Sequence, residues 1–216
     1  YYRQKGNDYV FVHDKIIEGA LSLLTESEIC GIHYRIGQVL LKRRNTDGND
    51  NYLFDIINHL TFAKSMLDNG EKFALAALNS KAGEKAKKSY AYEAALKCFY
   101  GASDIIQEEG VIRDEERHEY LIKVYTECFI CEYMMDNMER SYELFTMLNR
   151  MAKTRAERVR IYTINCMLLF NFSRAEMAIE MGIKGLSILD IRISKRPGLV
   201  PILRELAAFR MRMLRR

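Results

Sequence analysis

Histidine and cysteine are the residue types in this chain whose spacing could support chemistry. His13 is followed directly by Asp14, and a carboxylate that orients an imidazole is half of the arrangement used by general bases in hydrolases. The other half would be a nucleophile or a metal. The sequence contains no Gly-x-Ser-x-Gly motif, phosphate-binding loop or His-Glu-x-x-His motif to supply one. We therefore expect a non-catalytic chain, and an enzyme that uses His13 is the least favoured alternative.

Cys128 and Cys131 form a Cys-x-x-Cys pair, which elsewhere binds a metal or cycles between thiols and a disulfide. A metal site needs further ligands, and no histidine pair stands at ligand spacing. The histidines are His13, His33, His59 and His118. Both cysteines continue a helical apolar stripe through Leu121 and Val124, so they are predicted to be buried as small apolar side chains.

Two other histidines have structural interpretations. His59 lies in an apolar run, where we expect a packed ring that donates to a backbone or carboxylate partner. His118 lies in the charged run RDEERHE, which is typical of a solvated helix face. No metal and no cofactor is predicted for this chain.

Composition and charge exclude several classes of protein. Apolar residues make up 49% of the 216 residues, yet no uninterrupted apolar run approaches the length of a membrane span or of a signal peptide core. The five cysteines are scattered, which favours reduced thiols and a cytoplasmic location. The segment Arg204–Arg216 accounts for the whole net charge of +4, so no general basic face for nucleic acid is expected.

The C-terminal segment is predicted to be an amphipathic helix. Leu206, Phe209, Met213 and Leu214 fall on one face at helical spacing. Packing against a neighbouring helix is favoured over a separate nucleic-acid or membrane site. Left exposed, this face could drive formation of a homo-oligomer.

The elements that must position these residues are helices. The only prolines, Pro197 and Pro201, are near the C-terminus, and apolar stripes alternate with short polar turns. A β-capable run at 9–12 precedes a helix to about Leu24, a capping box at Thr25–Glu28 opens the next helix, and the polar segment 45–51 is predicted to break it. Further helices are predicted near 52–67, 71–88, 90–107, 114–134, 138–151, 154–170, 173–189 and 199–214. The fold class is all-α.

Small and aromatic residues recur where tetratricopeptide-type hairpins bring two helices together. In the first register Gly83 stands twelve residues before Ala95. The three registers are Ala95, Phe99 and Ala102, then Ser141, Phe145 and Leu148, then Ala178, Gly182 and Gly185. Their intervals are 46 and 37 residues, so the predicted architecture is a superhelix of degenerate tetratricopeptide-like hairpins. A closed bundle is the rival, but it would not require small residues at matching registers.

Several stretches together resemble one family. In order they are FVHDKIIEGALSLL, IHYRIGQVLL, LFDIINHLTFAKSML, LAALNSKAGEKAKKSYAYEAALKCFYGASDII and SKRPGLVPILRELAAF. They resemble the region after the nucleotide-binding core in STAND-class, AAA-related ATPases. The likeness is greatest to multidomain serine/threonine and histidine sensor kinases that contain this ATPase.

The resemblance implies that residues 1–44 are the end of a winged helix with connecting helices, and that 52–216 are a tetratricopeptide-like array, incomplete at the C-terminus. It implies that His13 senses the phosphate of bound ADP in the full-length protein, with ATP, ADP and Mg²⁺ belonging to that parent. Without a phosphate loop in this chain, Asp14 is expected to cap a helix and His13 to be idle. A sequence that starts at Tyr1 without Met is expected to be an excised segment.

The function implied is a non-catalytic helical-repeat module that mediates protein-protein interaction or relays a signal to neighbouring ATPase and kinase domains. Its expected partners are those domains and protein or peptide ligands, with no nucleic acid and no membrane. The alternative is a peptide-sensing repeat domain of a transcriptional regulator.

Overall fold

A computed structural model describes residues 2–5, 8–11, 15, 18–19, 22–48, 50–108, 110–195 and 198–214. Within these ranges the chain is predominantly helical, with two short 3-10 helices and one pair of strands. The α-helices are α2 (Glu26–Asp47), α3 (Leu53–Phe62), α4 (Asn69–Lys88), α5 (Tyr92–Ile106), α6 (Asp114–Met134), α7 (Met138–Met151), α8 (Arg155–Asn171), α9 (Ala175–Ile188) and α10 (Leu199–Leu214). The chain divides into two compact units, Tyr1–Val124 and Tyr125–Arg216.

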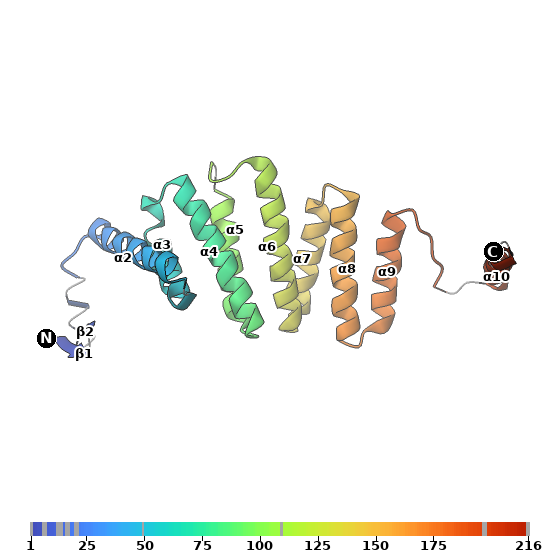
Figure 1. The fold of residues 1–216 in the computed structure, drawn as a ribbon, viewed down its shortest axis with the longest axis horizontal. Coiled ribbons are helices and arrows are strands. Elements are labelled where there is room, and N and C mark those ends of the chain that lie inside the picture. The colour runs from blue at the N-terminus through green and yellow to red at the C-terminus, as the bar shows by residue number, and fades with distance from the viewer. Residues whose placement is uncertain are drawn as a thin grey trace. The chain divides into compact units, whose positions relative to one another are not determined.

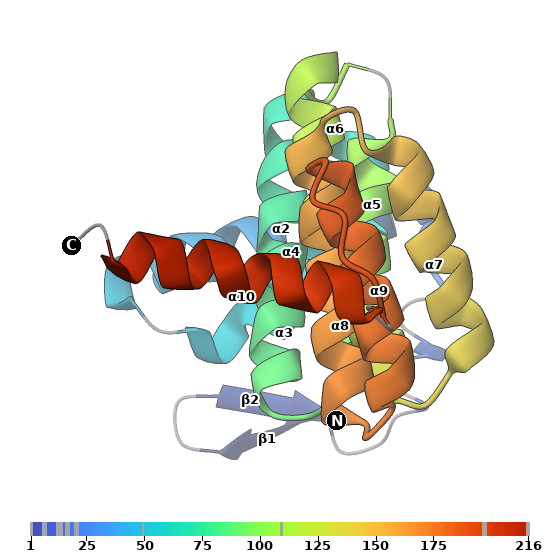
Figure 2. The ribbon, with the colours of Figure 1, turned by 90° about the vertical axis from the view of Figure 1, so that its right-hand side faces the viewer.

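The strands form an antiparallel hairpin at the N-terminus. β1 (Tyr2–Lys5) lies beside β2 (Asp8–Phe11) in Figure 2. The register of the pair places Tyr2 opposite Phe11. The apolar run at 9–12 indicated β2 in the sequence. β1 had no such signal, because its residues are polar apart from Tyr2 and it is defined by pairing with β2.

Helix α2 begins at the predicted capping box and is longer than predicted. The Thr25 hydroxyl accepts a bond from the Glu28 backbone N–H, and the Glu28 carboxylate accepts one from the Thr25 backbone N–H. The predicted break at 45–51 is wrong for its first residues, because α2 continues to Asp47. Gly48 then ends it in the left-handed conformation, with φ 62° and a bond from its N–H to the Arg44 carbonyl. The proposed domain division there stays a prediction.

The helix predicted near 52–67 is three shorter pieces, η1 (Asp50–Tyr52), α3 and η2 (Lys64–Met66). Asp68 explains where the last piece ends, because its side chain accepts a bond from the Glu71 N–H and caps α4. The core of the first unit is formed by α3, α4 and α5. Its fully buried side chains include Leu53, Ile56, Leu75 and Ile106.

Three pairs of helices, α4/α5, α6/α7 and α8/α9, are joined by the same short turn. In each turn one non-glycine residue has a left-handed backbone, with φ 60° at Tyr90, 59° at Asp136 and 60° at Ser173. In each turn, the backbone N–H of the residue that follows donates a hydrogen bond to the backbone carbonyl five residues before it. These bonds join Ala91 to Ala86, Asn137 to Glu132 and Arg174 to Leu169, at 3.0, 3.0 and 2.9 Å. Helices α4 and α5, and likewise α8 and α9, therefore lie side by side as hairpins (Figure 1).

Candidate functional site

The His-Asp pair lies outside the described residues. Nothing in the structure places His13 or Asp14, so the phosphate-sensing role of the histidine and the capping role of the aspartate stay predictions.

The first register of small residues lies at the contact between α4 and α5. Ala95 and Ala102 are fully buried, and Phe99 is nearly so. A Cβ atom added at Gly83 would lie 2.7 Å from the Phe99 ring. Gly83 is therefore the residue that lets this ring lie against the backbone of α4.

The second and third registers lie at corresponding positions in α6/α7 and α8/α9. Ser141, Leu148, Ala178 and Gly185 are buried, whereas Phe145 and Gly182 are half-buried. In each register, the middle residue lies next to the residue that stands sixteen positions before it in the sequence. Gly83 contacts Phe99, the Phe129 and Phe145 rings are 6.1 Å apart, and Gly182 lies beside Cys166. Phe129 and Cys166 were missed in the sequence, although both stand twelve residues before a register, as Gly83 does.

A groove of about 520 Å³ runs between α3 and α5, with α4 at its floor. We call it the α3–α5 groove. Phe54 and Phe62 from α3 form one wall and are 40% and 51% exposed, while Lys97 and Asp104 stand on the α5 side. The groove thus combines aromatic surface with charges of both signs.

Asn79 forms part of the floor of this groove, and its side chain is only 4% exposed. Its Nδ2 donates to the Leu75 carbonyl at 3.1 Å, and its Oδ1 accepts no bond from the described residues. A Cβ at Gly101 would lie 3.2 Å from that oxygen, so glycine keeps the space above it open. The Oδ1 is not among the buried polar atoms of the described residues that lack a partner, so it is open to the groove and can accept a hydrogen bond from a backbone N–H of a ligand.

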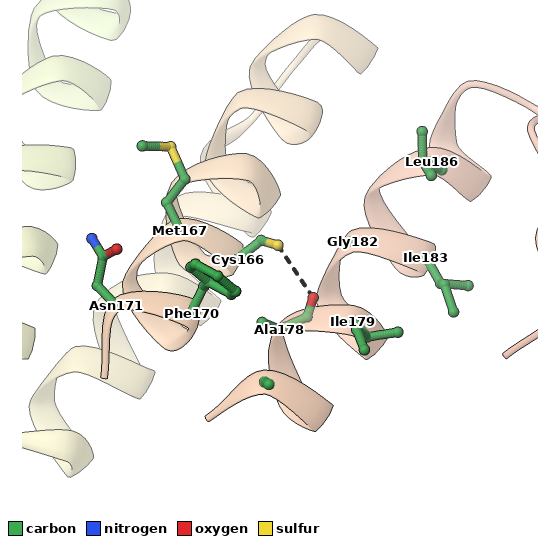
Figure 3. Close-up of a pocket in the computed structure, with 10 residues that line it drawn as sticks. Cys166, Met167, Phe170, Asn171, Ala178, Ile179, Gly182, Ile183 and Leu186 are labelled. Atoms are coloured by element: carbon green, nitrogen blue, oxygen red, sulfur yellow. Dashed lines mark hydrogen bonds between the residues drawn. The ribbon is translucent and has the colours of Figure 1, made fainter. Parts of the chain in front are cut away.

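A second groove, of about 540 Å³, lies along one side of the last hairpin (Figure 3). Figure 3 shows the lining residues Met167 and Phe170 on α8 and Ile179 and Ile183 on α9, and the Cys166 thiol donates a hydrogen bond to the Ala178 carbonyl at 3.2 Å. Phe170 is 70% exposed. This surface is almost entirely apolar, which suits packing against another apolar helix face and offers little for catalysis.

The Cys-x-x-Cys pair is buried as predicted. Cys128 and Cys131 are free thiols with no exposed surface. Burial, followed by the nearby Cys131 and Glu132, raises the pKa of the Cys128 thiol far above its usual value. A thiol held in its neutral form is a poor nucleophile and a poor metal ligand.

The partner of His59 is another histidine. The Nδ1 atoms of His33 and His59 are 2.9 Å apart, and the His33 ring also stacks on Phe62 at 4.2 Å between centroids. The predicted backbone or carboxylate partner is therefore wrong. His118 is half-buried and has an interaction partner, while residues 113–116 and Glu119 of the same charged run are exposed. Among the described residues, no group of three or more His, Cys, Asp or Glu is placed to hold a metal ion.

No family model, curated protein or solved structure matches this chain. A search of the described helices for one long and apolar enough to cross a membrane found none.

Proposed function

We propose that this chain is a non-catalytic helical-repeat module of a multidomain STAND-class signalling ATPase and kinase. In this proposal it binds a protein or peptide segment and relays that event to the neighbouring domains. Its place is the cytoplasm. ATP, ADP and Mg²⁺ are ligands of the parent protein and not of this segment.

The observation that carries the proposal is the recurrence of one hairpin. The turns at Tyr90, Asp136 and Ser173 share one backbone geometry and are separated by 46 and 37 residues, the same intervals as the registers of small residues. Hairpins built on one plan bury their apolar faces against neighbours and leave extended surfaces for ligands. Such surfaces serve recognition in this class of architecture.

The α3–α5 groove is the surface we assign to the partner. Exposed aromatic side chains provide apolar contact area, and Asn79 provides an amide that can pair with a peptide backbone. A groove between two helices accommodates an amphipathic helix or an extended segment. The apolar groove along α8 and α9 is assigned instead to packing against a following helix of the array.

The N-terminal hairpin supports the proposed position in the parent protein. β1 and β2 precede the His-Asp pair, as the last strands of a winged helix would. In the parent, His13 would pair with a phosphate oxygen of ADP. Loss of that contact on nucleotide exchange would shift the arrangement of domains.

The partner surface is tested by selecting binders to the chain from a random peptide library and comparing two phenylalanine variants. Phe54 and Phe73 are both 40% exposed, but only Phe54 lines the groove. For the selected peptide, Phe54→Ala should weaken binding by about fivefold or more, and Phe73→Ala should leave it within about twofold. Equal effects, or peptides that bind other surfaces only, would contradict the assignment.

The non-catalytic assignment is tested by calorimetry with ADP, ATP and Mg²⁺ on the purified chain. No heat of binding is expected at nucleotide concentrations up to about 1 mM. Micromolar affinity, or hydrolysis that disappears in His13→Ala, would refute it. The context in the parent is tested by the flanking gene sequence, which should encode a phosphate loop upstream.

A further inference from the structure

A separate cavity of about 210 Å³, open to solvent beside the exposed side chains of Tyr142 and Met177, lies where α6, α7, α8 and α9 of the second unit meet. Its walls are mostly apolar, with Phe129 and Phe145 on one side and the flexible side chains of Met138, Met177 and Met181 around them. An engineered apolar cavity of roughly 150 Å³ binds benzene, so this space is sufficient for one aromatic ring with a short extension. Methionines adapt their shape to a ligand.

Tyr133 brings an unpaired polar group to this cavity. The residue is 3% exposed, and its buried hydroxyl has no hydrogen-bond partner in the described part of the chain. The ring is held by edge-on contact with Phe172, at 5.0 Å between centroids. A buried hydroxyl without a partner is destabilising, so the position favours a ligand that accepts its hydrogen bond.

Arg174 supplies positive charge at the same cavity. Its guanidinium contacts the Met138 sulfur at 3.4 Å and pairs with no carboxylate of the described residues. Arg174 is also the N-cap residue of α9, where no side chain caps the helix, so the positive end of the helix dipole adds to its charge.

The opposing charge is Asp136, in the turn before α7. Burial raises the pKa of the Tyr133 hydroxyl, Arg174 lowers it and Asp136 raises it, and the effect of Arg174 exceeds that of Asp136.

We propose that this cavity binds a small aromatic carboxylic acid. The ring lies between Phe129, Phe145 and the methionines. The carboxylate accepts a hydrogen bond from the Tyr133 hydroxyl and pairs with the Arg174 guanidinium. This site is independent of the α3–α5 groove, so its failure would leave the proposed function standing.

The probe is 3-phenylpropionate, with its neutral amide as the matched ligand. Binding to the 216-residue chain is measured by nuclear magnetic resonance of methionine methyl groups. The signals of Met138, Met177 and Met181 should shift, whereas that of Met66, in the first unit, should not. A dissociation constant at or below about 1 mM is expected, with the amide weaker by about tenfold.

Three variants identify the groups involved. Arg174→Gln should weaken 3-phenylpropionate by about fivefold or more without changing the weak affinity of the amide, because only the carboxylate pairs with the guanidinium. Tyr133→Phe should weaken 3-phenylpropionate by about threefold or more. Arg160→Gln, at an exposed position of α8 away from the cavity, is the control and should bind as the parent chain does. Circular dichroism establishes that each variant is folded.

Any of three results would overturn the proposal. One is the absence of methyl shifts at ligand concentrations about tenfold above the expected dissociation constant. The second is equal affinity for acid and amide, and the third is unchanged affinity in both Arg174→Gln and Tyr133→Phe. In either case the cavity would lack anion recognition.

Discussion

Replacing Gly83 by alanine should destabilise the chain, whereas the same change at Gly31 should stabilise it. Both glycines lie inside helices, where alanine is intrinsically more favourable by about 1 kcal/mol. A Cβ at Gly31 would meet nothing within 4 Å. At Gly83 it would lie 2.7 to 2.8 Å from three carbons of the Phe99 ring, closer than van der Waals contact allows.

The loss of stability expected for Gly83→Ala follows from the surroundings of the Phe99 ring. The ring is 1% exposed and cannot move into solvent, so α4 and α5 must separate or the ring must leave its preferred rotamer. Overpacking of this kind costs about 1 to 3 kcal/mol, which offsets or exceeds the gain in helix propensity. The two variants should therefore differ in free energy of unfolding by about 1 to 3 kcal/mol, with Gly83→Ala the less stable.

Urea unfolding followed by far-ultraviolet circular dichroism measures both variants. Combining Gly83→Ala with Phe99→Leu should recover part of the loss, because a smaller side chain leaves room for the methyl group, and the double-mutant cycle isolates this coupling. If Gly83→Ala stabilised the chain as much as Gly31→Ala, the close contact between α4 and α5 would be refuted.

Three further predictions concern other parts of the chain. Burial, and then the charge of His59, lower the pKa of His33, so the unfolded chain binds more protons than the folded chain once the pH falls below about 6.5. The melting temperature should therefore drop between about pH 7 and pH 5, and His33→Gln should flatten that drop. Ser173→Gly should raise the free energy of unfolding by about 1 kcal/mol, because Ser173 has a left-handed backbone that glycine adopts without strain. In the same urea assay, Ser187→Gly inside α9 should lower the free energy of unfolding by about 0.5 to 1 kcal/mol. Tyr133→Phe should raise the melting temperature of the ligand-free chain, since it removes a buried hydroxyl without a partner; a lower melting temperature would indicate a partner for that hydroxyl.

Much of the helical architecture could be predicted because helix ends are local features. The bounds predicted at 114–134, 138–151 and 199–214 agree with α6, α7 and α10, since apolar periodicity and short polar turns define them within a few residues. The start of α4 was predicted only to within two residues, at 71 instead of Asn69, because the capping box of Asp68 and Glu71 was missed. The extension of α2 to Asp47 was not predicted, because Asn, Thr and Asp disfavour a helix only weakly and the helix ends at Gly48.

The sequence by itself determined the fold class, most helix boundaries and the burial of the small residues, because caps, turn residues and helical periodicity act over a few neighbouring positions. Only the tertiary structure decided which side chains meet. His33 and His59 are 26 residues apart in the chain, and Tyr133 and Arg174 come from α6 and the start of α9. Contacts of this kind depend on how whole helices pack, and no local pattern records that geometry.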